Sequence, residues 1–254
     1  MIHTNLTLCF PDMERSERRQ LARASLAQIG RLVFDLAQIR FWSIERLLED
    51  VEIEGEASLK SAFESDRGLL LLVPHFGNWE LLCAYLGVHY SVAALYDPPK
   101  IKSLEPIMIA CRENYQGTMY PIDVGGMRGI LKELKAGRLV AVLPDQVPSR
   151  DAGEYADFYG HPALTMTLPK QLVDRTDAAV LMGSVQRIKT TDGRYGHRLT
   201  FEPLPETGDE VSFERKINLA VESVIARAPE QYQWSYKRFK RPPTVGPTNV
   251  YRRQ

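Results

Sequence analysis

Short apolar runs that alternate with helix-like segments constrain the fold of this chain more than any other feature. The run from Gly68 to Val73 is continuously apolar, as expected for a strand buried on both faces of a parallel sheet. Further strand-like runs cover 91–96, 118–122, 139–143, 178–188 and 197–201, and helical patterns cover 78–87, 103–115, 127–135, 163–176 and 213–226. This alternation predicts an α/β fold with a mainly parallel central sheet flanked by helices. A short turn at Asp192-Gly193 makes the last two strands antiparallel.

The chain reads as a single domain, 1–254, with a helical N-terminal segment at 1–50 and an irregular basic tail at 242–254. In the N-terminal segment apolar residues recur at helical spacing, namely Leu26, Ile29, Val33, Leu36 and Ile39. This stripe fits a helix packed on the core, and it also fits an interfacial helix with aromatic anchors. Sparse basic residues along the stripe favour the core interpretation.

Composition excludes several function classes. Lys plus Arg and Asp plus Glu are balanced at 32 each, so no global charge attracts nucleic acid or an anionic membrane. The three cysteines are scattered and form no C-x-x-C pair, which indicates small core residues in a reducing, cytoplasmic environment and neither a metal nor a redox site. No stretch of about eighteen apolar residues predicts a transmembrane helix, so contact with a membrane is expected from its surface.

A histidine box follows the first apolar strand. His75 lies two residues beyond Val73, Gly77 permits a tight turn, and Asn78 is a good N-cap that places Glu80 in the first helical turn. Five positions within one helix would set His75 and Glu80 about 140° apart, so they can meet only if His75 lies on the loop. Glu80 is then expected to accept a hydrogen bond from one imidazole nitrogen, leaving the other as a general base. The alternative is a histidine satisfied by a local cap.

Further polar motifs follow later in the chain. Asp145 and Gln146 follow the strand at 139–143. Asp145 is expected to hold a site arginine or a loop in place, and a strand-end cap is the alternative. Phe158-Tyr-Gly-His-Pro162 and Pro229-Glu-Gln-Tyr-Gln-Trp234 come next. The segment 234–254 has no acidic residue but contains several basic ones, Lys237, Arg238, Lys240, Arg241, Arg252 and Arg253. This patch suits phosphate groups, anionic headgroups or an acidic carrier protein, and a solvated tail is the alternative. No nucleic-acid motif accompanies it.

In this order the motifs HFGNWE, GMRGILKELKAG, PDQ, FYGHPALT and PEQYQWSYKRFKRP resemble the late acyltransferases of lipid A biosynthesis, within the glycerolipid acyltransferase superfamily. The resemblance extends from Thr4 to Pro242. It implies that His75 is the base and that Glu80 orients it. It also implies polar substrate-binding residues, namely Arg112, Arg128, Asp145, Gln146 and Arg238. The backbone amides of Gly77 and Asn78, or an arginine, would face the oxyanion. No metal or cofactor is implied.

The resemblance also implies the partners. An acyl chain moves from acyl carrier protein or coenzyme A to a hydroxyl of a membrane glycolipid similar to a lipid A precursor. Family members usually carry a membrane-spanning helix before the Thr4-Asn5-Leu6 segment, where this chain begins. The expected location is therefore peripheral, on the cytoplasmic face of the inner membrane, or soluble in the cytoplasm. Ser235-Tyr236 stands where a histidine is common. The alternatives are an acyl-thioester hydrolase, an acyltransferase for another glycolipid or lysophospholipid, and a non-catalytic binding protein.

Overall fold

The structure is a computed structural model, and it describes residues 1–65, 67–96, 117–190, 192–243 and 250–251. Its helices are α1 (Ile2–Cys9), α2 (Arg15–Phe41), α3 (Ile44–Leu48), α4 (Glu56–Glu64), α5 (Trp79–His89), α7 (Val124–Lys135), α8 (Leu168–Thr176) and α9 (Phe213–Arg227), with 3₁₀ turns η2 (Arg150–Ala152) and η3 (Pro229–Gln231). Its strands are β1 (Val51–Glu54), β2 (Leu69–Leu72), β3 (Val92–Tyr96), β4 (Thr118–Pro121), β5 (Leu139–Val142), β6 (Gly153–Phe158), β7 (His161–Met166), β8 (Ala179–Lys189) and β9 (Tyr195–Pro203).

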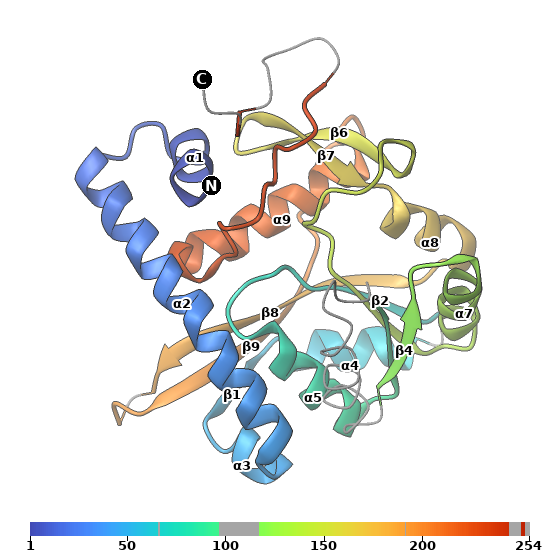
Figure 1. Ribbon diagram of the computed structural model, residues 1–254. Coiled ribbons are helices and arrows are strands. Elements are labelled where there is room, and N and C mark those ends of the chain that lie inside the picture. Colours follow the sequence, from blue (N-terminus) through green and yellow to red (C-terminus); the bar gives the residue numbers. More distant parts are fainter. Residues whose placement is uncertain (66, 97–116, 191, 244–249, 252–254) are drawn as a thin grey trace.

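Seven strands form the central sheet in the order β1-β9-β8-β2-β5-β3-β4 (Figure 1). The pairs β8–β2, β2–β5, β5–β3 and β3–β4 are parallel, whereas β8 and β9 pair as an antiparallel hairpin. The prediction of an α/β fold with a mainly parallel sheet and an antiparallel element after β8 is confirmed. The central strands β2 and β5 are buried at every position, as their uninterrupted apolar runs predict.

The two faces of the sheet carry separate hydrophobic cores. Because side chains alternate along a strand, Leu70 and Leu72 of β2 pack in the core that includes α7, α8 and α9. Leu69 and Leu71 point to the opposite face and pack in the core that includes α4 and α5. Covering both faces with helices leaves the carboxyl ends of the parallel strands as the open edge at which a site can form.

The predicted helix at 163–176 is wrong in its first part. Residues from Ala163 to Met166 belong to β7, which pairs with β6 in an antiparallel hairpin, and only α8 is helical. Pro169, interpreted as a break inside the helix, lies in the first turn of α8, where its missing N–H costs no hydrogen bond. The hairpin turns at Tyr159 and Gly160, both with positive φ. The predicted helix at 103–115 lies outside the described residues.

The N-terminal segment is more structured than its sequence pattern indicates. The predicted helical segment 1–50 contains α1, the long helix α2 and the short helix α3, and the edge strand β1 and helix α4 follow it. Helix α2 runs along one side of the molecule, from α1 near α9 to α3 beside β1 (Figure 1). Within the described part of the chain, none of the helices has the length and apolar character that a membrane crossing requires.

Candidate active site

Two polar side chains meet where β2 and β5 end. These strands are parallel neighbours, and their pairing continues one residue further through a hydrogen bond from Val73 N to Val142 O. His75 follows β2 and Asp145 follows β5, so both residues leave the sheet at the same edge. This is the edge of a parallel sheet at which binding sites usually form.

Asp145 holds His75 through two hydrogen bonds. The His75 backbone N–H donates to Asp145 Oδ2 at 3.0 Å, and the Nδ1 of the ring lies 2.8 Å from Asp145 Oδ1. On the other side of the ring, Gln146 Nε2 lies 3.0 Å from His75 Nε2. Because an ionised carboxylate can only accept, the neutral ring carries its proton on Nδ1, and Nε2 keeps its lone pair. His75 is therefore arranged as a base at Nε2.

The prediction that Glu80 accepts a hydrogen bond from the ring of His75 is wrong. Both ring nitrogens of His75 have other partners, Asp145 and Gln146, and the orienting carboxylate comes from the neighbouring strand end. Glu80 lies in the first turn of α5, and its side chain lines the same cavity as His75. The sequence singled out Asp145 but could not place it, because adjacency of β2 and β5 is a property of the sheet.

Burial and pairing act in opposite directions on Asp145. Burial raises the pKa of this carboxyl, but the charge of His75 and the hydrogen bonds from its ring and backbone outweigh burial, so the pKa of Asp145 is lowered overall. Asp145 is thus ionised at neutral pH. A fixed negative charge beside Nδ1 stabilises the imidazolium that forms whenever Nε2 takes up a proton.

A cavity of about 740 Å³ opens beside the ring of His75. Near His75, its walls carry polar groups from Glu80, Gln146 and Gln233. The remaining walls are mainly apolar and come from several elements of the fold, with Leu82, Cys83, Leu86, Leu95, Met119 and Met166 among them. A reactive nitrogen at the polar end of an apolar cavity suits a ligand with a long hydrocarbon chain and a polar reacting group.

The C-terminal segment fixes the loop that carries His75. Gln233 N donates to His75 O at 3.1 Å, and Gly77 N donates to Gln231 O at 3.0 Å. The side chain of Gln231 also reaches across to β8, where it accepts from Arg187 N and donates to Arg187 O. The motif at 229–234 is visible in the sequence, but nothing local predicts a role for these glutamines. Their position just after a helix is the only signal that the sequence contains.

The backbone amides of Gly77 and Asn78 are not available to an oxyanion, contrary to expectation. Gly77 N donates to Gln231 O and Asn78 N donates to Val185 O, because the loop crosses β8 closely at this point. Asn78 is the N-cap residue of α5 as predicted, but its side chain makes no cap hydrogen bond and contacts His197. Gln146 is the expected site residue whose donor group does reach His75.

The expected arginines lie in different environments. Arg238 is 2% exposed and donates to Leu164 O, Thr165 Oγ1 and Asn218 Oδ1, so the prediction that it binds substrate is wrong. Burial lowers the pKa of Arg238, and its guanidinium ties β7 to α9. Arg128 is exposed on α7 and, unlike its neighbour Met127, is not among the described residues that line the His75 cavity. Arg112 lies outside the described residues.

Sequence comparisons identify the family of the chain. The family described as bacterial lipid A biosynthesis acyltransferase matches residues 1–241. The chain is 29% identical over 249 residues to the lipid A biosynthesis palmitoleoyltransferase of Escherichia coli K12, covering 97% of this chain and 80% of the relative. It is 27% identical over 251 residues to the lauroyltransferase of the same strain, covering 98% and 81%, respectively. A match over nearly the whole chain, with His75 set as a base above an apolar cavity, shows that this protein belongs to the bacterial lipid A biosynthesis acyltransferase family.

Proposed function

We propose that the protein transfers a fatty acyl chain from an acyl thioester to a hydroxyl of a lipid A-type glycolipid. The observation that carries the proposal is the pairing of His75 with Asp145 at the polar end of an apolar cavity. The family and its named relatives supply the acceptor class. Acyl carrier protein is the proposed donor, and coenzyme A is the alternative that the assay below separates from it.

The proposed reaction uses His75 twice. The lone pair of Nε2 takes the proton of the acceptor hydroxyl as its oxygen attacks the thioester carbonyl, and Asp145 stabilises the resulting imidazolium. The tetrahedral intermediate then collapses: the carbon–sulfur bond breaks, and Nε2 returns the proton to the departing sulfur. The acceptor hydroxyl supplies the nucleophile, so the chain itself forms no covalent intermediate.

Two further groups complete the proposed site. The Gln146 amide lies 3.0 Å from Nε2 and donates a hydrogen bond to the oxygen that becomes negatively charged. Glu80 lines the cavity beside His75 and accepts hydrogen bonds from the acceptor, which positions its reacting hydroxyl. Arg128, exposed on α7, and Arg112 are proposed to bind phosphate groups of the acceptor.

Purified protein tests this proposal when it is supplied with labelled acyl carrier protein or acyl-coenzyme A and a lipid A precursor. We expect acylated glycolipid from the wild type, and a loss of about 10²–10⁴-fold in rate for His75→Ala. His3→Ala, at an exposed histidine of α1, is the matched control and keeps full activity. Full activity of His75→Ala would refute the mechanism. Release of free fatty acid alone, with the acceptor present, would show a hydrolase.

A further inference from the structure

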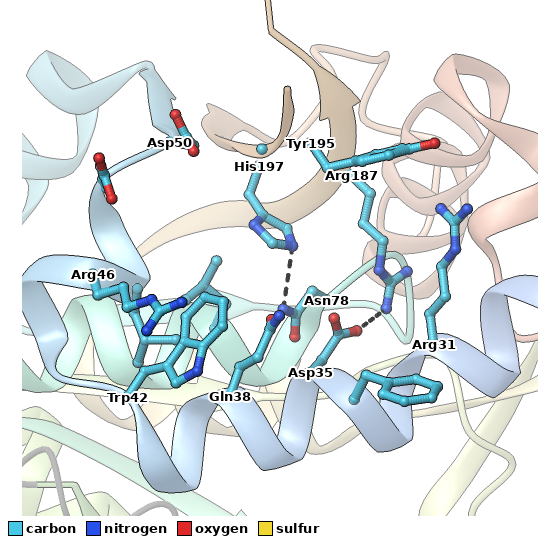
Figure 2. A pocket seen from close by; sticks show the side chains of 15 residues that line it. Arg31, Asp35, Gln38, Trp42, Arg46, Asp50, Asn78, Arg187, Tyr195 and His197 are labelled. Atoms are coloured by element: carbon cyan, nitrogen blue, oxygen red, sulfur yellow. Dashed lines mark hydrogen bonds and ion pairs between the residues drawn. The ribbon is translucent and has the colours of Figure 1, made fainter. Parts of the chain in front are cut away.

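A second cavity, of about 520 Å³, lies on the other side of the histidine box (Figure 2). It is lined by α2, α3 and the β8–β9 hairpin, and by side chains from the start of α5. His75, Trp79 and Glu80 line the cavity beside His75, called the acyl cavity from here on, whereas Asn78 and Leu81 line the second cavity. The two cavities therefore share the loop–helix junction from 75 to 82 as a common wall, and nothing in the proposed reaction uses the second one.

Two residues that line this cavity, Asn78 and Arg187, each carry a polar atom without a hydrogen-bond partner in the described part of the chain. Asn78 is 2% exposed, its amide nitrogen lies 3.3 Å from His197 Nε2, and its buried Oδ1 has no partner among the described residues. If the amide is turned over, the nitrogen is left instead, so one polar atom stays available in either orientation. Arg187 forms a buried ion pair with Asp35, and its Nε is also buried without a partner in the described part of the chain. Both atoms are almost inaccessible in this conformation, so a hydroxyl-bearing ligand would satisfy them only if these side chains turned toward the cavity.

Two arginines stand at the mouth of the cavity. Arg31 lies over the ring of Tyr195 and Arg46 over the ring of Trp42, with guanidinium carbons 5.6 and 4.0 Å from the ring centres. Neither guanidinium has an acidic partner within the described ranges, and Figure 2 shows them at opposite sides of the opening. Among the acidic residues of the lining, Asp35 pairs with Arg187, while Glu49 and Asp50 share Arg194 with Asp192. Arg31 and Arg46 form no ion pair among the described residues, so each can contact an anionic group at the opening.

The outer face of α2 indicates where the ligand comes from. Leu26, Val33, Phe34 and Phe41 are 62%, 70%, 71% and 78% exposed, and their seven- and eight-residue spacing places them on one face of the helix. The same face carries exposed arginines, namely Arg15, Arg19, Arg23 and Arg40. The only acidic residue of α2 beyond Glu17 is Asp35, which is buried. Apolar and basic side chains without acids suit the interface of an anionic membrane.

The sequence pattern favoured a core-packed helix over an interfacial helix for the N-terminal stripe, and the structure shows features of both. The apolar residues divide: Ile39 is buried in the core, while Leu26 and Val33 face outward beside the arginines. Phe34 belongs both to the exposed face and to the lining of the second cavity. The cavity therefore opens next to the surface that is suited to lipid.

We propose that this second cavity binds the head group of an anionic membrane lipid, with its phosphate at Arg31 or Arg46 and its hydroxyls at Asn78 and His197. The acyl chains of that lipid would lie along the exposed face of α2. The proposal does not depend on the acyl-transfer reaction, because it concerns binding alone, and it predicts binding by the His75→Ala variant as well.

Titration calorimetry with short-chain phosphatidylglycerol below its micelle concentration tests the cavity itself. We expect saturable binding at one site, weakened at least about tenfold in Arg31→Gln/Arg46→Gln, since a charge-assisted hydrogen bond to phosphate is lost at each position. Lys135→Gln/Arg175→Gln removes the same charge from exposed positions on α7 and α8 and should bind like the wild type. Thermal melts serve as the check that all variants are folded.

Three comparisons separate the possible sources of binding. Short-chain phosphatidylcholine, which has no net charge, should bind at least about tenfold more weakly than phosphatidylglycerol. Inorganic phosphate should compete only weakly, and competition by phosphate as strong as by the lipid would reduce the site to a free-anion site. Equal binding of phosphatidylglycerol by the arginine variant and the wild type would overturn the proposal. Loss of acyl transfer in His75→Ala with lipid binding intact would leave it standing.

Discussion

A single proton on Nδ1 decides whether His75 can act as a base. Asp145 fixes that proton by accepting from Nδ1, and Gln146 approaches the lone pair on Nε2. If the carboxylate becomes an amide, the ring can adopt the other tautomer, which presents a proton instead of a lone pair to the acceptor. The carboxylate of Asp145 therefore fixes the tautomer of the His75 ring as well as its orientation.

Asp145→Asn is expected to lower kcat by about 10³–10⁴-fold, the magnitude known for the same change in catalytic triads. Nitrogen-15 NMR of the histidine rings should show His75 leaving the Nδ1–H tautomer. Glu80→Gln is the comparison: it also removes a carboxylate from the cavity, but it should keep the wild-type tautomer. A tautomer change in Glu80→Gln and none in Asp145→Asn would restore Glu80 as the orienting group.

His197 is expected to make stability depend on pH. Burial, together with the charge of Arg187, lowers the pKa of His197 to about 4. Between the unfolded value of about 6.5 and this folded value, the unfolded chain binds a proton that the folded chain excludes, so the free energy of unfolding falls as the pH falls. The loss between pH 7 and pH 5 should be about 2 kcal/mol.

Urea unfolding at pH 7 and pH 5 measures this dependence. His197→Gln should reduce the difference between the two pH values, whereas His89→Gln, at an exposed histidine of α5, should not. An unchanged pH dependence in His197→Gln would mean that other groups are responsible.

At the scale of elements, the junction between β2 and α5 depends on contact with β8. Gly77 has a φ of +57°, and a Cβ there would lie 1.7 Å from Val185 O. Gly193, in the turn of the β8–β9 hairpin, also has a positive φ of +83°, but a Cβ there would meet nothing within 4 Å. The two glycines therefore separate backbone strain from steric overlap.

Gly77→Ala should lower the free energy of unfolding by more than about 3 kcal/mol and displace His75, because β8 and the loop must move apart. Gly193→Ala should cost only about 1 kcal/mol, the penalty of a left-handed conformation for alanine. Chemical denaturation and acyl-transfer rates check both. A Gly77→Ala protein that is as stable and as active as Gly193→Ala would contradict the close contact.

How far the sequence predicts these elements depends on whether the signal is local. The apolar runs of β2 and β5 predict buried parallel strands, and His75 is placed correctly on the loop after β2. The partner of His75 depends on strand order, which no local pattern contains. The end of β7, from Ala163 to Met166, was predicted as helix because a short apolar stretch fits both periods. The wrong role of Arg238 arose because burial is decided by tertiary packing.

At the scale of the whole molecule, the acyl cavity is a joint product of the sheet, α5, α7, α8 and the β6–β7 hairpin. Along α5, Trp79 lies beside His75, with Cys83 about 6 Å and Leu86 about 10 Å further along the helix axis, at 1.5 Å per residue. The cavity therefore extends along about two turns of this helix, and if the acyl chain lies in it as proposed, side-chain size on the inner face of α5 should limit the length of that chain.

Cys83→Trp should shift the preference to shorter acyl chains, because the indole fills the middle of the cavity. Rates with a series of acyl donors of increasing chain length measure the shift. Val88→Trp is the matched control, since Val88 is 43% exposed on the same helix and does not line the cavity. An unaltered chain-length profile in Cys83→Trp would place the acyl chain elsewhere.

The backbone hydrogen bonds that join Gln231 and Gln233 to the histidine loop have a consequence for biosynthesis. The catalytic loop is translated early, yet the backbone partners that fix it are translated more than 150 residues later, since 231 − 77 is 154. The parallel strands β2 and β5 can pair while the ribosome is still at work, but His75 acquires its final support only after residue 233 has emerged. In a nascent chain, His75 can therefore meet Asp145 well before residues 231 and 233 fix the backbone of its loop, so the histidine is oriented by its carboxylate first and by the later segment second.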